Sequence, residues 1–245
     1  MSLKLMSAVV AADWGRWIRR ALSLAIGVAL IKALFGSYVP FGYWEFWQQN
    51  GQWQDWLIAG WPMLVWGIVI SGISSLLTSN NRAENDNAEA LFLADFNTSV
   101  RAGVMEEIIF RWLLLMTAIL ATRISDFILG GFIFGRGFVW LLQSYIVMPV
   151  VNLLSMGMLS EWLSRPECWF VAAAIIVANT KFRDGHKYQG PIGLANSWFI
   201  GLFLFHIMFR FGLPAAILLH LLYDVFIDVV RYVDRAAERQ KQKRR

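Results

Sequence analysis

Cysteine is almost missing from this chain, in which Cys168 is the only one among 245 residues. A single cysteine cannot form an intramolecular disulfide, and the sequence contains neither a CxxC pair nor a cysteine–histidine zinc pattern. A disulfide framework and a cysteine-based zinc site are therefore both excluded.

Charged residues are also scarce, at 16% of the chain, whereas soluble domains have about 25%. Hydrophobic residues make up 58%, well above the roughly 45–50% of soluble domains, and the chain carries 18 Phe and 13 Trp. This composition predicts an integral membrane protein that folds as one all-α domain over residues 1–245. We expect a polytopic bundle of transmembrane helices surrounded by membrane lipids.

The net charge of +5 is not a nucleic-acid-binding signature, because much of it lies in a basic tail at residues 231–245. Such a tail is typical of a cytoplasmic membrane anchor; a disordered tail without a partner is the alternative interpretation. Near the start of the chain, Arg16, Arg19 and Arg20 follow a short apolar run where a cleavage site would stand. The sequence therefore does not predict a removable signal peptide.

Apolar segments that approach the length of a membrane span recur along the chain. A span needs about 20 mostly apolar residues. The candidate segments are 21–39, 56–77, 102–120, 127–163, 169–178, 197–209 and 214–230.

Residues 127–163 decide the number of spans, because this segment is too long for one and contains Arg136, Pro149 and several glycines. Two short spans there give eight in all, with both termini and most basic residues in the cytoplasm. One span gives seven and moves the basic tail outside. Because cytoplasmic loops are enriched in Lys and Arg, the sequence favours about eight transmembrane helices, with seven as the alternative.

Two adjacent carboxylates, Glu106 and Glu107, interrupt the apolar segment 102–120. A charge at membrane depth costs about 3 kcal/mol on insertion scales and usually marks function. Residues four apart share a helix face, so Glu107 and Arg111 can pair, whereas Glu106 has no partner in its own helix. A purely structural Glu106, bonded to a neighbouring helix, is the competing interpretation.

A second polar group lies in the last apolar segment, where His220 and Asp224 are again four residues apart. A carboxylate one turn away fixes the orientation and the tautomer of an imidazole. Of the other two histidines, His186 lies in the charged stretch KFRDGHKYQG and His206 interrupts an apolar segment. A histidine that only bridges two helices is the alternative at His220 and the favoured interpretation at His206.

Three motifs occur in order along the chain: EExxxR at residues 106–111, FxxxH at 182–186 and HxxxD at 220–224. Together they resemble the CAAX-protease and bacteriocin-processing family of intramembrane endopeptidases, also called the CPBP or Abi family. The resemblance covers residues 100–230 and includes Gly201, since the penultimate helix of the family contains a glycine.

The middle motif departs from the family pattern. The family histidine usually ends an apolar helix, whereas the segment from Phe182 to His186 reads FRDGH, with charges and a glycine. An alternative alignment places Asn179 where that histidine belongs, which replaces a key imidazole by an amide. We favour His186 because the literal match is kept. His206 is a poor substitute, since Leu202 stands where the motif has phenylalanine.

The resemblance implies hydrolysis of a peptide bond in a membrane-associated or lipidated protein or peptide. In this interpretation Glu106 takes a proton from the attacking water, as a general base. Glu107 is held by Arg111 and shapes the site.

The resemblance also assigns roles to the histidines. His186 and His220 would stabilise the oxyanion or orient the water, and Asp224 would orient His220. The family is described both as metalloprotease and as metal-free, glutamate-dependent enzyme. The resemblance therefore leaves two possibilities, zinc bound by Glu106, His186 and His220, or no metal.

Two other function classes are compatible with the sequence. A catalytically degenerate relative would act as a membrane scaffold, an assembly factor or a binding partner in a larger membrane complex, and would keep the polar cluster for folding. A small transporter would use the carboxylates as a proton relay, although no inverted repeat is visible. The Trp-rich stretch at 43–56 is expected to lie in the membrane interface or, alternatively, to form a docking surface.

Overall fold

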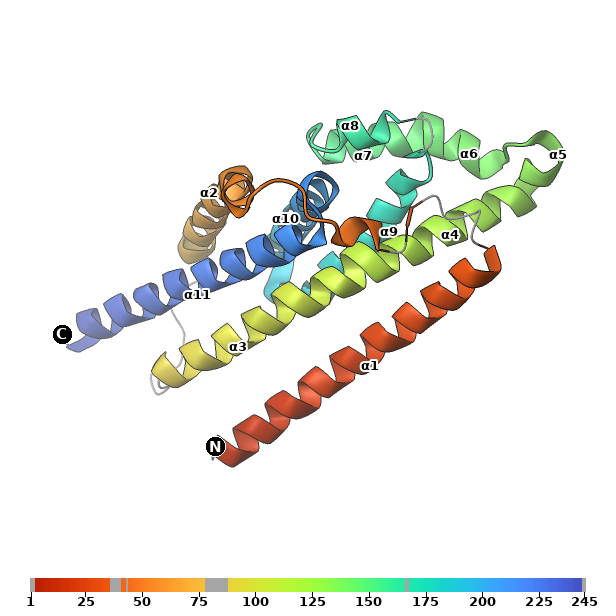
Figure 1. The fold of residues 1–245 in the computed structure, drawn as a ribbon. Helices are drawn as coiled ribbons and strands as arrows, with labels where there is room; N and C mark the ends of the chain where they lie inside the picture. The colour runs from red at the N-terminus through yellow and green to blue at the C-terminus, as the bar shows by residue number, and fades with distance from the viewer. Residues whose placement is uncertain (1–2, 36–40, 43, 78–87, 166–167, 244–245) are drawn as a thin grey trace.

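The computed structural model describes residues 3–35, 41–42, 44–77, 88–165 and 168–243, and every regular element in these ranges is a helix. The predicted all-α fold is confirmed. Figure 1 shows the axes of the long helices α1, α3 and α11 roughly aligned, with α11 running opposite to α1 and α3, and a layer of shorter helices across one end.

The helical elements of the described residues fall into four groups by type and length. The long α-helices are α1 (Leu3–Phe35), α2 (Trp53–Leu77), α3 (Ala88–Glu106), α10 (Gly190–Phe211) and α11 (Leu213–Lys243). The shorter ones are α4 (Leu115–Asp126), α5 (Phe132–Phe134), α6 (Phe138–Leu142), α7 (Met148–Leu154), α8 (Ser160–Leu163) and α9 (Val171–Gly185). The π-helical segments are η3 (Glu107–Leu114), η4 (Phe127–Gly131) and η5 (Gln143–Val147), and the 3-10 turns are η2 (Glu45–Trp47) and η7 (Lys187–Gln189).

Four helical stretches in the described ranges are long and apolar enough to cross a membrane: Trp53–Ile73, Phe96–Phe134, Lys187–Phe211 and Leu213–Val233. This finding supports a membrane-spanning bundle but not the predicted eight transmembrane helices. The expected segment 21–39 runs into residues 36–40, which lie outside the described ranges. Most of the segment 169–178 lies in α9, which begins at Val171 and whose 15 residues are too few for a span.

Residues 127–163 do not form two spans, because the chain reverses near their beginning. The helix of α4 is interrupted within η4, where Leu129 and Gly130 have non-helical dihedral angles, with φ 106° at Gly130. After the short α5, Gly135 adopts a left-handed conformation with φ 76°. The Asp126 carboxylate accepts hydrogen bonds from the backbone amides of Gly137, at 3.0 Å, and Trp140, at 2.6 Å. The buried carboxylate at the end of α4 thus holds the beginning of α6 beside α4.

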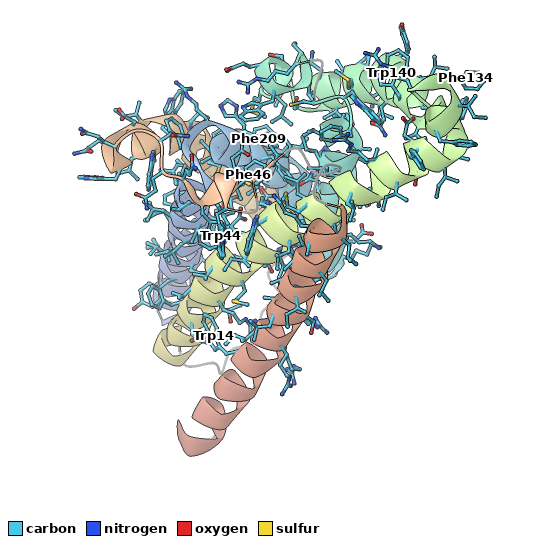
Figure 2. All side chains as sticks on the ribbon, turned by 45° about the vertical axis from the view of Figure 1, so that its right-hand side comes forward. Trp14, Trp44, Phe46, Phe134, Trp140 and Phe209 are labelled. Atoms are coloured by element: carbon cyan, nitrogen blue, oxygen red, sulfur yellow. The ribbon has the colours of Figure 1, made fainter. Side chains whose placement is uncertain are left out.

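The apolar helix that follows the reversal, Phe138–Leu154, is shorter than a membrane span. It lies across the end of the long helices in Figure 1, and Phe134 and Trp140 lie at this end of the molecule in Figure 2. One long segment predicted as two membrane crossings is therefore a helix extension followed by a capping layer.

The centre of the bundle is α10. Within the apolar windows, 61% of the residues of α10 are buried and only 22% of those of α2, so α10 is central and α2 peripheral. Gly103 allows α3 to approach α11 closely, because a Cβ at this position would stand 3.0 Å from the Leu221 Cα. Gly201 does the same between α10 and α9, where a Cβ would overlap the side-chain oxygen of Asn179. The first approach joins helices that are distant in sequence and the second packs two consecutive helices, and both α9 and α11 contact η3.

The Trp-rich stretch is packed on one side only. Phe46 and Trp56 are buried, whereas Trp44 and Trp53 are exposed. The rings of Phe46 and Phe209, both labelled in Figure 2, are 5.8 Å apart. Neither the interfacial position nor the docking role predicted for this stretch is tested by its packing. At the C-terminal end, the basic tail continues α11 as far as Lys243.

Candidate functional site

The EExxxR motif forms a dry ion pair at the start of the π-helical segment η3. Arg111 Nη1 lies 2.9 Å from Glu107 Oε1, and both side chains are fully buried. The guanidinium carbon of Arg111 lies 3.8 Å from the ring centroid of Phe182, on α9. Because a buried charge needs close compensation, the carboxylate and the aromatic face together make Arg111 tolerable in this position. The pairing expected from the four-residue spacing is present.

His220 joins this pair from α11, across 113 residues of sequence. Its Nδ1 lies 2.7 Å from Glu107 Oε1, and its Nε2 lies 3.5 Å from Asp224 Oδ2. The imidazole is 3% exposed and is held between two carboxylates. The contact with Asp224 was predicted, whereas the shorter contact with Glu107 was not. No spacing in the sequence points to it.

Glu106 faces a different neighbour on the wetter side of the same turn. Its Oε2 lies 4.0 Å from His186 Nε2, and the two side chains are 15% and 19% exposed. No hydrogen-bond partner of Glu106 Oε2 is present among the described residues. The site therefore has a dry interior, formed by Glu107, Arg111 and His220, and a partly exposed edge, formed by Glu106 and His186.

The orientation of His186 follows from its backbone contact. Its Nδ1 lies 2.9 Å from the carbonyl oxygen of Phe182, which can only accept a hydrogen bond. Nδ1 therefore carries the proton, and in the neutral ring Nε2 presents its lone pair towards Glu106. A separation of 4.0 Å is too long for a direct hydrogen bond, and Glu106 Oε2 itself is buried although other atoms of its side chain are exposed.

The charged side chains of the FRDGH segment form ion pairs with adjacent residues. α9 continues to Gly185, so His186 follows directly after the helix end. Asp184 lies 2.7 Å from Arg183 Nη2 and 3.2 Å from Lys187 Nζ. The hydrogen bond from Arg183 lowers the pKa of Asp184 below its ordinary value. Asp184 therefore pairs with these two cations, and the carboxylate that faces His186 is that of Glu106.

Asn179, the alternative for the middle motif, faces away from the carboxylates. Its Nδ2 donates a hydrogen bond of 3.1 Å to the carbonyl oxygen of Trp198, and its Oδ1 lies against Gly201. Of the two candidates, the structure therefore places His186 beside Glu106. His206 lies in α10, where its Nδ1 is 2.7 Å from the carbonyl oxygen of Met158. This contact bridges α10 to the capping layer.

The three side chains named as zinc ligands do not converge as a ligand set. The described residues contain no group of three histidine, cysteine, aspartate or glutamate side chains arranged to hold a metal ion. Both nitrogens of His220 face other carboxylates, Glu107 and Asp224, rather than Glu106 and His186. The zinc hypothesis therefore finds no support in this geometry.

No protein-family model, no curated protein and no solved structure matches this chain significantly.

Proposed function

We propose that this chain is an intramembrane peptidase, of the kind its three motifs resemble, which hydrolyses a peptide bond in a membrane-associated or lipidated protein or peptide. One observation carries the proposal: Glu106 and His186 face each other at 4.0 Å on the partly exposed edge of a buried polar cluster. A purely structural pair would be expected to bond directly or to be fully enclosed.

In the proposed reaction a water molecule enters between these two groups, and the side chains must part to admit it because Glu106 Oε2 is buried. The water donates one hydrogen bond to His186 Nε2 and one to Glu106, which leaves a lone pair of its oxygen directed towards the scissile carbonyl carbon. As the new C–O bond forms, Glu106 takes the proton from the water. When the C–N bond breaks, Glu106 returns that proton to the leaving amine. General acid–base catalysis of this type contributes roughly 10²–10⁴-fold to the rate.

The dry interior positions this edge and does not touch the reacting atoms. Arg111 compensates the charge of Glu107, the residue next to the proposed base, and His220 fixes the same carboxylate oxygen from α11. Because both nitrogens of His220 are occupied, the proposal assigns it a positioning role, with Asp224 behind it. The proposal retains a cytoplasmic location for both termini, which the distribution of basic residues supports.

The test uses Glu106→Gln and Glu106→Ala, with Glu161→Gln as the matched control. Glu161 lies on α8 and pairs weakly with Arg165, at 3.6 Å on the exposed surface. Substrates are first identified as membrane proteins that accumulate uncut in a strain lacking the chain, and a membrane-tethered peptide is then made from the cut site. We expect both Glu106 variants to lose at least about 10² in turnover, while Glu161→Gln keeps the parent rate. Parent turnover in both Glu106 variants would end the glutamate mechanism.

The second candidate function is a non-catalytic membrane scaffold or assembly factor within a larger complex. It is favoured by the full burial of Glu107 and Arg111, because such a network also serves folding. The two functions differ in what Glu106→Gln changes. A scaffold predicts lower thermal stability or a lost complex, whereas the peptidase predicts lost turnover with an unchanged melting temperature.

A further inference from the structure

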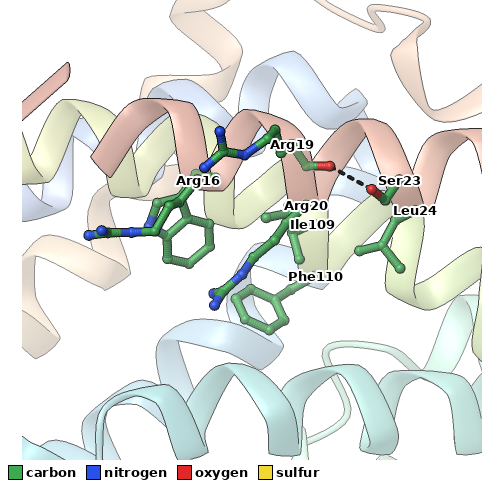
Figure 3. Close-up of a pocket in the computed structure, with 8 residues that line it drawn as sticks. Arg16, Arg19, Arg20, Ser23, Leu24, Ile109 and Phe110 are labelled. Atoms are coloured by element: carbon green, nitrogen blue, oxygen red, sulfur yellow. Dashed lines mark hydrogen bonds between the residues drawn. The ribbon is translucent and has the colours of Figure 1, made fainter. Parts of the chain in front are cut away.

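A basic groove separates α1 from the segment that carries the candidate site. Its cavity volume is about 630 Å³. The residues along its two walls include Arg16, Trp17, Arg19 and Arg20 of α1 and Ile109 and Phe110 of η3. Figure 3 shows Arg20 reaching from α1 towards Phe110. The groove thus has a cationic wall on one helix and an apolar wall on the other.

The spacing of the arginines concentrates positive charge on the α1 wall of this groove. Positions 16, 19 and 20 are three and four residues apart, so they gather on one side of a helix. All three side chains are exposed, and no acidic residue belongs to the described lining. Such a cluster matches an anion, and guanidinium groups bind phosphate oxygens in a bidentate manner.

Apolar side chains from both helices complete the lining of the groove. Leu24 lies two turns along α1 from Arg16 and Trp17, and it faces the same cavity as Ile109 and Phe110. Tryptophan is enriched where hydrocarbon meets headgroups, and Trp17 lines the same cavity, with the guanidinium carbon of Arg20 5.9 Å from its ring centroid. A ligand that complements both the arginine cluster and the apolar side chains has a phosphate head and a hydrocarbon chain.

The geometry points to a binding site for one anionic phospholipid, with its phosphate on Arg16, Arg19 and Arg20 and an acyl chain along Leu24 and Phe110. The inference concerns binding alone, so it does not depend on the proposed hydrolysis. It differs from general attraction to an anionic membrane, because it requires three particular arginines and a defined apolar wall.

The test measures how tightly the purified protein, in uncharged detergent, binds a phosphatidic acid that has one oleoyl chain and one fluorescent acyl chain. The groove variant is Arg16→Gln/Arg19→Gln/Arg20→Gln. The matched control is Arg136→Gln/Arg165→Gln/Arg210→Gln, which removes the same charge from sites outside the groove. Each guanidinium near an anionic headgroup contributes about fivefold in affinity, so the groove variant is expected to bind roughly a hundredfold more weakly. The control should keep the affinity of the parent.

A second variant tests the apolar wall without changing the charge. Leu24→Gln is expected to weaken binding of phosphatidic acid severalfold and to leave the binding of inorganic phosphate unchanged. Melting temperatures of all variants are measured first, and a variant that is not folded is replaced by the corresponding single substitutions.

Three results would overturn the inference. Equal losses in the groove variant and the control would show that only total charge matters. If inorganic phosphate displaced the fluorescent lipid at the concentration at which unlabelled phosphatidic acid does, the groove would be a site for free phosphate instead. Displacement by an acidic peptide at lower concentrations than by unlabelled phosphatidic acid would make the groove a protein-docking site.

Discussion

Replacing Arg111 with leucine should destabilise the protein by about 3 kcal/mol. Among the described residues Arg111 has the largest fully buried side chain, and the side chain of its partner Glu107 is also fully buried. Removing one member of a buried ion pair costs about 3–5 kcal/mol, because the remaining charge is left uncompensated. We expect the lower end of this range, since His220 still contacts Glu107 at 2.7 Å.

The assay is thermal unfolding of the purified protein in detergent, followed by tryptophan fluorescence. For a chain of this size 1 kcal/mol corresponds to roughly 2–4 °C, so Arg111→Leu should lower the melting temperature by about 6–12 °C. Arg111→Lys keeps the charge but loses the planar contact with Phe182, so it should lower the melting temperature by a smaller amount. Adding Glu107→Gln to Arg111→Leu removes the orphaned charge and should restore part of the stability.

Two results would refute this reasoning. An Arg111→Leu variant that melts within about 2 °C of the parent would mean that Glu107 does not need its partner. A double variant at least as unstable as Arg111→Leu would mean that the cost comes from lost packing around the guanidinium and not from charge.

Three further substitutions test the close approach at Gly201, the hydrogen bonds to Asp126 and the role of His186. Gly201→Ala should cost about 1–3 kcal/mol in thermal unfolding, because the new methyl group overlaps Asn179, and Asn179→Ala in the same chain should recover part of that cost; no recovery would contradict the close approach. Asp126→Ala should cost about 0.5–2 kcal/mol, since it removes the acceptor for the first amides of α6. Hydrogen exchange at Trp140 should then accelerate, and unchanged exchange would count against the cap. His186→Gln should lower turnover by roughly 10² and leave the melting temperature unchanged; a stability loss instead would indicate a structural histidine.

Local patterns in the sequence were sufficient for several features of this protein. Composition predicted the all-α fold, and the apolar runs located the four helical stretches that can cross a membrane. The four-residue spacing of Glu107 and Arg111 predicted their ion pair. These predictions succeed because they depend on helix periodicity and on the hydrophobicity of a short window.

Hydrophobicity alone failed at residues 127–163, where two spans were predicted. The reversal there depends on the Asp126 carboxylate, which accepts amide hydrogens 11 and 14 residues further along the chain. The π-helical form of η3 was also missed, since its i→i+5 hydrogen bonds leave no composition signal.

By itself, the sequence determined that the chain is helical, where four long apolar stretches lie and which acidic, basic and imidazole groups they carry, because these properties follow from neighbouring residues. Only the tertiary structure decided that His220 bonds to Glu107, that His186 faces Glu106 and that Asn179 does not. Those choices depend on how closely whole helices approach. Glycines at 103 and 201 permit the two approaches, but only the packed bundle shows which neighbours they admit.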